Sequence, residues 1–145
     1  MRVDAVIDTG ATMVVLPKKL VKELGLEKIE NVKVKVKYGD GRVEGKEVYG
    51  VVRLELKGRV GNFDVLPEND EARPLVGQIV LERLDLIIEP STRKLIPNPR
   101  SPEMPMIEVF LVATSPNSRD TATLRSAQIR QSRTSHVRQT LGDIL

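Results

Sequence analysis

Short apolar runs bounded by glycine and proline set the strongest limit on how this chain can fold. Valine, leucine and isoleucine cluster in brief stretches over the first hundred residues, and Gly, Pro, Asn or Asp follows most of them. Many short strands with frequent turn signals are typical of a small barrel or sandwich. The sequence therefore predicts a mostly β domain with strands at residues 3–7, 12–16, 32–38, 42–48, 51–56, 61–66, 86–88 and 94–96, and with turns at 39–41 and 58–61.

One or two short helices are expected within this β domain. Apolar residues recur at helical spacing in residues 18–24, where Pro17 suits the first turn and Gly25 suits the C-terminal cap. Residues 81–86 predict a second helix of one or two turns.

The composition excludes several kinds of chemistry. The chain has 145 residues, enough for one domain with a modest core. It contains no Cys, and its single His is His136, so a disulfide framework, a His-based triad and a multi-His metal site are all excluded. We therefore expect no metal and no cofactor. No stretch has the length of a membrane span, and the sequence after Met1 lacks a signal-peptide pattern, so a cytoplasmic protein that makes no membrane contact is expected.

The charge pattern does not favour nucleic acid as a partner. The net charge is +3, and both signs are interspersed over the first hundred residues. Lys33, Lys35 and Lys37 alternate with valines, which a strand with one solvated face explains without any ligand. Aromatic residues make up only 3% of the chain, too few for a base-stacking platform.

A change in composition after Arg100 divides the chain into two parts. All lysines precede this point, and the basic residues that follow it are arginines among many Ser, Thr, Gln and Asn. We therefore expect a domain over residues 1–100 and an irregular tail over 101–145, poorly ordered or weakly helical across 121–145. A nucleic-acid arm and a partner-binding helix are alternative interpretations of this tail.

The motif Asp8-Thr9-Gly10-Ala11 directly follows the apolar run at residues 3–7. A carboxylate at the end of a buried strand loses hydration, so it is expected there only if hydrogen-bond partners stabilise it or if it has a function. Gly10 allows close backbone approach and Thr9 can both donate and accept a hydrogen bond, so the turn suits an acid that meets another backbone or another acid. An ordinary strand-ending turn also explains these residue types.

The neighbourhood of this motif resembles the retropepsin-like aspartic proteases, specifically their single-lobe prokaryotic members. The resemblance covers residues 3–99, and its pieces occur in the family's order: Asp8-Thr9-Gly10-Ala11-Thr12, the short helix at 17–24, the glycine hairpin at 38–42, Pro74-Leu75-Val76-Gly77, and the segment 81–90. The tripeptide alone is a weak signal, whereas the ordered set is fairly specific.

The resemblance implies that Asp8 is catalytic. Aspartic proteases hydrolyse peptides with two carboxyl groups that share one proton. The chain has a single Asp-Thr-Gly, so two copies must supply the pair, and a homodimer is expected. In that arrangement Thr9 braces the two loops, the amide of Gly10 holds the carboxylate, and Ala11 lines the floor.

The resemblance also assigns the hairpin and the downstream glycine. The hairpin would be a flap that closes over an extended peptide, with Tyr38, Gly39, Asp40 and Gly41 as its substrate-facing residues, although Asp40 departs from the apolar flap of viral members. Val76 and Gly77 would support the active-site loop from beneath as structural residues. Asp64, Asp70 and Asp85 are expected to be solvated or capping residues rather than catalytic ones.

The region before Asp8 differs from the family pattern. Family members usually have a further strand pair there, so the N-terminal strand of the 1–100 domain is expected to be missing from this sequence. One hypothesis is that the apolar run at residues 106–113 folds back as a strand and covers the edge left open.

Three functions follow, of which the first is favoured. The chain is expected to be a dimeric aspartic endopeptidase acting on peptides or unfolded protein. The alternative is a catalytically silent retropepsin-like module for dimerisation or peptide binding. A third hypothesis compares Asp8-Thr9-Gly10-Ala11-Thr12 with the phosphate turn of sugar kinases and actin-like proteins, but those folds need far more chain.

Overall fold

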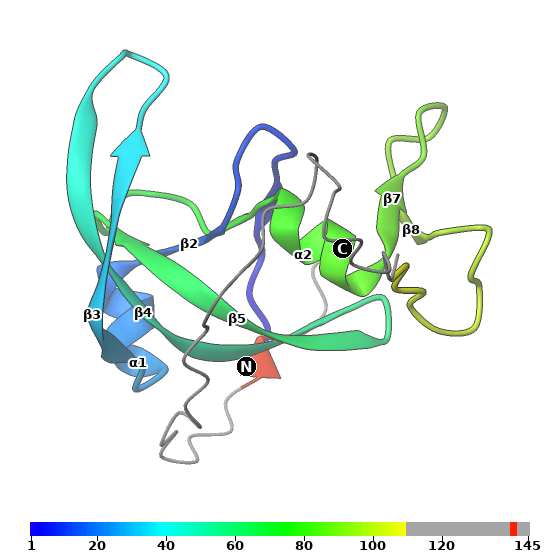
Figure 1. Cartoon of the computed structure of the whole chain (residues 1–145), viewed down its shortest axis with the longest axis horizontal. Helices are drawn as coiled ribbons and strands as arrows, with labels where there is room; N and C mark the ends of the chain where they lie inside the picture. Colours follow the sequence, from blue (N-terminus) through cyan, green and yellow to red (C-terminus); the bar gives the residue numbers. More distant parts are fainter. Residues whose placement is uncertain (110–139, 142–145) are drawn as a thin grey trace, which may run out of the picture.

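The computed structural model describes residues 1–109 and 140–141, and over these residues it is mostly β with two short helices (Figure 1). A seven-stranded sheet has the order β1-β6-β2-β5-β4-β3 with β9 paired to β4, and β7 and β8 form a separate antiparallel pair. This confirms the predicted fold class. The elements are β1 (Val6–Ile7), β2 (Val14–Pro17), α1 (Lys18–Glu23), β3 (Glu27–Lys37), β4 (Val43–Leu56), β5 (Arg59–Glu68), β6 (Leu75–Val76), α2 (Gln78–Leu84), β7 (Leu86–Ile88), β8 (Leu95–Pro97) and β9 (Thr140–Leu141).

The core is aliphatic, because the sequence offers few aromatic side chains. Alternate residues of β2, β4 and β5 point inward and meet the buried faces of α1 and α2. Phe63 is the one aromatic side chain among the buried core residues of the described part of the chain. The largest fully buried side chains are Leu16, Leu24, Leu54, Leu56 and Leu84.

The β3–β4 hairpin is longer than the sequence predicts. β4 continues from Val43 to Leu56 through the expected break at residues 49–50, and β3 begins at Glu27 rather than at residue 32. Both strands absorb an irregularity: the β3–β4 register shifts around Asn31, whose φ is 62°, and the β4–β5 register shifts just after Tyr49. Bulges of this kind allow a strand to bend without ending.

The position predicted for the turn between β4 and β5 is wrong. The turn lies at Lys57 and Gly58, which both have positive φ, rather than across residues 58–61. Such a two-residue turn matches the twist of the flanking strands. Gly61 instead lies within β5, where an added Cβ would come within 2.8 Å of the Phe63 ring, so this glycine makes room for core packing.

The end of α1 follows from local residues, whereas the start of α2 depends on residues distant in the sequence. α1 ends as predicted, because Gly25 has a φ of 65° and its amide donates to the Lys22 carbonyl at 3.0 Å, while Leu26 donates to the Val21 carbonyl at 3.1 Å. α2 begins at Gln78, three residues before the predicted start, for reasons that concern the candidate site.

Asp85 ends α2 in the left-handed conformation and organises the residues that follow. Its carboxylate accepts hydrogen bonds from the Ser101 hydroxyl, from the Asn98 amide at 2.9 Å and from the Met106 backbone N–H at 3.0 Å. These bonds, Ser101 first, lower the pKa of Asp85 to about 2. The buried Arg59 donates to the carbonyls of Leu84 at 3.0 Å and Asp85 at 2.8 Å, and to that of Ser101.

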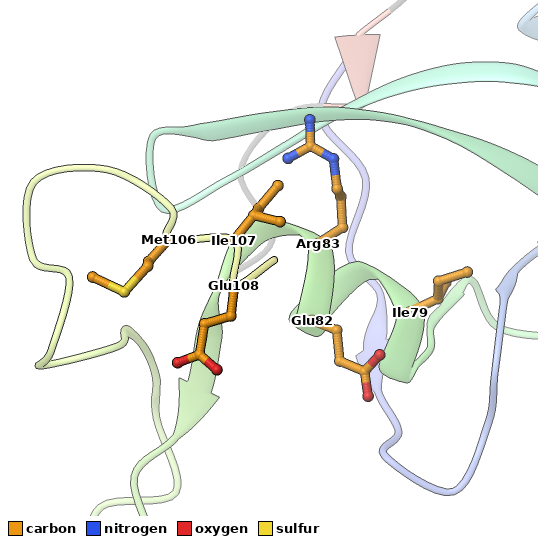
Figure 2. A pocket seen from close by; sticks show the side chains of 6 residues that line it. All are labelled: Ile79, Glu82, Arg83, Met106, Ile107 and Glu108. Carbon is orange, nitrogen blue, oxygen red and sulfur yellow. The ribbon is translucent and has the colours of Figure 1, made fainter. Parts of the chain in front are cut away.

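The hypothesis of a strand at residues 106–113 is contradicted over 106–109, while residues 110–113 lie outside the described part of the chain. Residues 106–109 form no strand in the described part of the chain, because Asp85 captures the Met106 amide. Met106, Ile107 and Glu108 instead lie beside α2, where they line a surface hollow of about 430 Å³ (Figure 2). Within the stretch expected to be weakly helical, Thr140–Leu141 form β9 parallel to β4. The remainder of the predicted tail lies outside the described residues.

No helix of the described ranges has the length and apolar character needed to cross a membrane.

Candidate active site

The Asp8 loop connects β1 to β2 and is fixed at its start by β6. β1 and β6 are parallel, with Ile7 opposite Val76, and the Asp8 backbone N–H donates to the Val76 carbonyl at 3.0 Å. The Ala11 N–H donates back to the Asp8 carbonyl at 3.2 Å, which closes a tight turn. The chain therefore leaves the sheet at Asp8 with its direction set by a neighbouring strand.

The Asp8 carboxylate lies half-buried on this turn. Its Oδ1 atom accepts a hydrogen bond from the Gly10 backbone N–H at 2.8 Å. Thr9 and Gly10 are exposed on either side of the turn's apex, so the carboxylate is presented at the molecular surface rather than enclosed in the core. A second molecule can therefore approach it.

Gly77 lies directly beneath the loop, at the point where two segments cross. A Cβ at this position would come within 2.5 Å of the Met13 carbonyl oxygen and 2.6 Å of the Thr12 carbonyl carbon. No residue other than glycine fits without moving the backbone. The crossing is closed by two hydrogen bonds, from the Gln78 N–H to the Ala11 carbonyl at 2.8 Å and from the Ile79 N–H to the Thr12 carbonyl at 3.0 Å.

These two bonds explain the early start of α2. The first amides of a helix have no partner within the helix. In α2 the carbonyls of the Asp8 loop accept them, so the helix begins directly after Gly77. Because this pairing joins residues 67 positions apart in the sequence, no local sequence pattern could reveal it.

The predicted flap is the tip of the β3–β4 hairpin, residues 38–42, which we call the hairpin tip. Tyr38 and Arg42 close it through a 2.9 Å backbone hydrogen bond, and Gly41 has a φ of 90°. Asp40 Oδ1 accepts the Arg42 N–H at 2.9 Å, and its Oδ2 atom accepts the Arg42 Nε–H at the same distance. The hairpin tip and the Asp8 loop project to the same side of the molecule (Figure 1).

The structure thus brings together some predicted site residues and leaves others apart. Asp8, Thr9, Gly10 and Ala11 share one loop, which rests on Val76 and Gly77. The hairpin-tip residues Tyr38, Gly39, Asp40 and Gly41 form a separate group, and within the described ranges no hydrogen bond joins them to the Asp8 loop.

Three further aspartates of the domain, Asp64, Asp70 and Asp85, make no side-chain hydrogen bond to this loop in the described part of the chain. Asp70 caps α1, because its Oδ1 atom accepts the Lys19 N–H at 2.8 Å. Asp85 holds the segment after α2, as described above. Asp64 lies on the solvent-facing side of β5, and partial desolvation by its neighbours raises its pKa.

Sequence inspection missed a polar cluster between the hairpin and β5. Tyr38 and Lys46 both hydrogen-bond to Glu68, which is 30 and 22 residues away in the sequence. Strand alternation could have placed Tyr38 and Lys46 on one face, but nothing local points to Glu68.

Neither of two surface hollows contains Asp8. The hollow of Figure 2 lies along α2, and another of about 680 Å³ lies between β1 and the β7–β8 pair. Across residues 1–109 and 140–141, no group of three or more Asp, Glu, His or Cys side chains is placed to hold a metal ion.

The comparisons with known proteins identify the family. The chain matches the aspartyl protease family model over residues 1–88, which is more than half of its 145 residues. The chain belongs to the aspartyl protease family, and this membership indicates a hydrolase.

A solved structure is similar to this chain at low identity. It is the retroviral protease-like domain of Ddi1 from Leishmania major, with 19% sequence identity and a TM-score of 0.44, and the similarity covers 67% of this chain and 79% of that chain. No curated protein matches significantly.

Proposed function

We propose that the chain is one subunit of a dimeric aspartic endopeptidase whose catalytic pair consists of Asp8 from each of two copies. The observation that carries the proposal is the position of Asp8: a half-buried carboxylate on a surface turn that is locked from beneath by the Gly77 crossing. A fixed backbone with an accessible acid is what a pair of carboxylates meeting across a two-fold axis requires.

In this mechanism the two acids divide the work. One carboxylate is ionised and takes a proton from a bound water, which attacks the scissile carbonyl carbon, while the other carboxylic acid donates its proton to the carbonyl oxygen. The Gly10 N–H keeps the Asp8 carboxylate in place through the 2.8 Å hydrogen bond. Thr9, exposed beside it, is positioned to brace the loop of the other subunit, and Ala11 forms part of the floor.

The substrate is an extended peptide or an unfolded protein segment. The hairpin tip acts as the flap that covers it and excludes water from the reacting atoms. Gly39 and Gly41 leave space for a peptide backbone, because an added Cβ at either position meets nothing within 4 Å.

Cleavage of a denatured protein by the wild type and by Asp8→Asn tests this proposal. The substitution should abolish cleavage and leave the fold and dimer intact, whereas Asp4→Asn, an exposed acid four residues earlier, should cleave normally. Pepstatin should inhibit the wild type. Full activity in Asp8→Asn would refute the proposal.

Mixing the two forms tests whether the site is shared. If each site needs Asp8 from both subunits, an equal mixture that has exchanged subunits retains about a quarter of its dimers as active pairs. If each chain held a complete site, half of the activity would remain. A dimer that binds peptide without cleaving it would select the alternative of a silent binding module.

A further inference from the structure

Three side chains join the hairpin to the end of β5. Tyr38 stands just before the turn, Lys46 lies on β4 and Glu68 is the last residue of β5. The Tyr38 hydroxyl donates to Glu68 Oε2 at 2.7 Å, and the Lys46 ammonium donates to Glu68 Oε1 at 2.6 Å. Both oxygens of one carboxylate therefore hold the hairpin.

The ion pair within this cluster is shielded from solvent. The Lys46 and Glu68 side chains are 13% and 21% exposed, whereas those of the nearby Lys28–Glu47 pair are 51% and 41% exposed. Exposed pairs contribute little because water and salt screen them. The Lys46–Glu68 pair is the better placed of the two to hold the hairpin.

The Tyr38 ring is also fixed in direction. The Arg42 guanidinium lies 4.6 Å from the ring centroid and the Lys46 ammonium lies 5.6 Å from it. Arg42 is itself held by Asp40 at 2.9 Å and by Glu44 at 3.1 Å. Cations near an aromatic ring stabilise its position, so the hydroxyl stays directed at Glu68.

The anchor at Glu68 is tied to the support of the Asp8 loop. Glu68 lies opposite Pro17 in the β2–β5 pairing. The chain then passes through residues 69–74 into β6, where the Val76 carbonyl accepts the Asp8 N–H. The cluster therefore fixes the hairpin relative to the part of the sheet that carries the catalytic loop.

We propose that Tyr38, Lys46 and Glu68 form a latch that presets the hairpin tip, so that breaking it loosens the tip and weakens substrate binding. This inference rests on the proposed function, in which the tip covers a bound peptide. A preset hairpin loses less entropy when substrate binds than a freely moving one. The three residues act as positioning residues, since their contacts are with one another and with neighbouring groups of the hairpin and the end of β5.

The charges around Glu68 set the acidity at which the latch opens. Lys46 and Tyr38 face it directly, Arg42 and Glu44 lie around the Tyr38 ring, and the Asn69 N–H donates to it at 3.2 Å. Partial burial acts to raise the pKa of Glu68, but the hydrogen bonds from Lys46 and Tyr38 outweigh it and the pKa is lowered. The latch therefore stays charged in mild acid and is released below the ordinary Glu pKa of about 4.3.

Amide hydrogen exchange of the full chain tests the latch without any measurement of activity. In Glu68→Gln and Tyr38→Phe, exchange at the hydrogen-bonded amides of Tyr38, Gly41 and Arg42 should become about tenfold faster than in the wild type. The matched control is Glu47→Gln, which breaks the exposed ion pair on the same hairpin and should change these rates less than about twofold. Unchanged exchange in the β4–β5 core shows that the fold is intact.

Two results would overturn the latch. The first is equal exchange at the hairpin tip in all four proteins. The second is faster exchange throughout the core in Glu68→Gln and Tyr38→Phe, which would make the cluster a general stabiliser rather than a latch.

Steady-state kinetics then test whether the latch contributes to substrate binding. KM should rise several-fold in the two latch variants with kcat nearly unchanged, and an unchanged KM would overturn this part of the inference. If Asp8→Asn retains activity, the proposed function fails while the exchange experiment still decides whether the latch exists.

Discussion

Replacing Gly77 with alanine should damage both the stability and the activity of this protein. The new Cβ would lie 2.5 Å from the Met13 carbonyl oxygen, well inside the 3.4 Å at which ordinary contacts begin. The nearest atoms all belong to the backbone, so no side chain can rotate away. The Asp8 loop and the start of α2 must therefore separate by about 1 Å.

The size of the effect follows from this displacement. It would stretch the hydrogen bonds now at 2.8 Å and 3.0 Å, from Gln78 to Ala11 and from Ile79 to Thr12, beyond useful length. Two lost bonds cost about 1–3 kcal/mol and the forced packing about 1–3 kcal/mol. The free energy of unfolding should therefore fall by about 2–6 kcal/mol. In the proposed enzyme, a shift of about 1 Å at a catalytic group lowers the rate by about 100-fold.

Urea unfolding followed by circular dichroism measures the first effect, and cleavage of a denatured protein measures the second. Gly45→Ala is the matched control, because a Cβ at Gly45 meets nothing within 4 Å on the open face of β4. That variant should be as stable as the wild type or slightly more stable. If Gly77→Ala matched Gly45→Ala in both assays, the crossing could not be what fixes the loop.

Three further substitutions test other parts of the structure. Arg59→Met removes the buried guanidinium from three backbone carbonyls and should lower the free energy of unfolding by about 3–5 kcal/mol in a urea titration; a loss below about 1 kcal/mol would contradict this role. Asp85→Asn should flatten the acid dependence of stability. The folded-state pKa of Asp85 lies near 2, so its contribution to stability is complete above the ordinary Asp pKa of about 4 and disappears as pH falls towards 2. If the melting temperature fell equally steeply with pH in both proteins between about pH 4 and pH 2, this role of Asp85 would be contradicted. Asp70→Ala removes the cap on the Lys19 N–H and should cost about 1 kcal/mol in thermal unfolding, an effect that Asp70→Asn should largely avoid.

Much of the fold could be predicted because its signals are local. Strand alternation, the glycine hairpin at 38–42 and the Gly25 cap each depend on neighbouring residues, and the structure contains all three. The family resemblance further placed the motifs around Asp8 and Gly77 in order, and the match to the aspartyl protease family over residues 1–88 agrees with it.

The errors arose where distant contacts decide the local structure. Gly61 resembles a turn residue, but the Phe63 ring and Leu84 fill the space that a side chain would occupy, and the strand continues through it. Residues 49–50 resemble a break, but pairing with β3 and β5 on either side keeps β4 continuous.

The candidate site shows the same division. The Asp8 turn can be recognised from its own residues, whereas the partners of Gly77 and Glu68 lie tens of residues away. A single sequence carries no record of such pairings, so their geometry had to come from the structure.

The bonds around Asp85 bear on how this domain should be produced for experiments. The family match ends at residue 88, yet the hydrogen-bond donors to the Asp85 carboxylate, Asn98, Ser101 and Met106, lie beyond that limit. A recombinant fragment cut at the family boundary would expose Arg59 and strip the end of α2, the helix whose opposite end supports the Asp8 loop. Expression limits drawn from the family match would therefore yield a destabilised domain, and a boundary beyond residue 106 keeps these bonds.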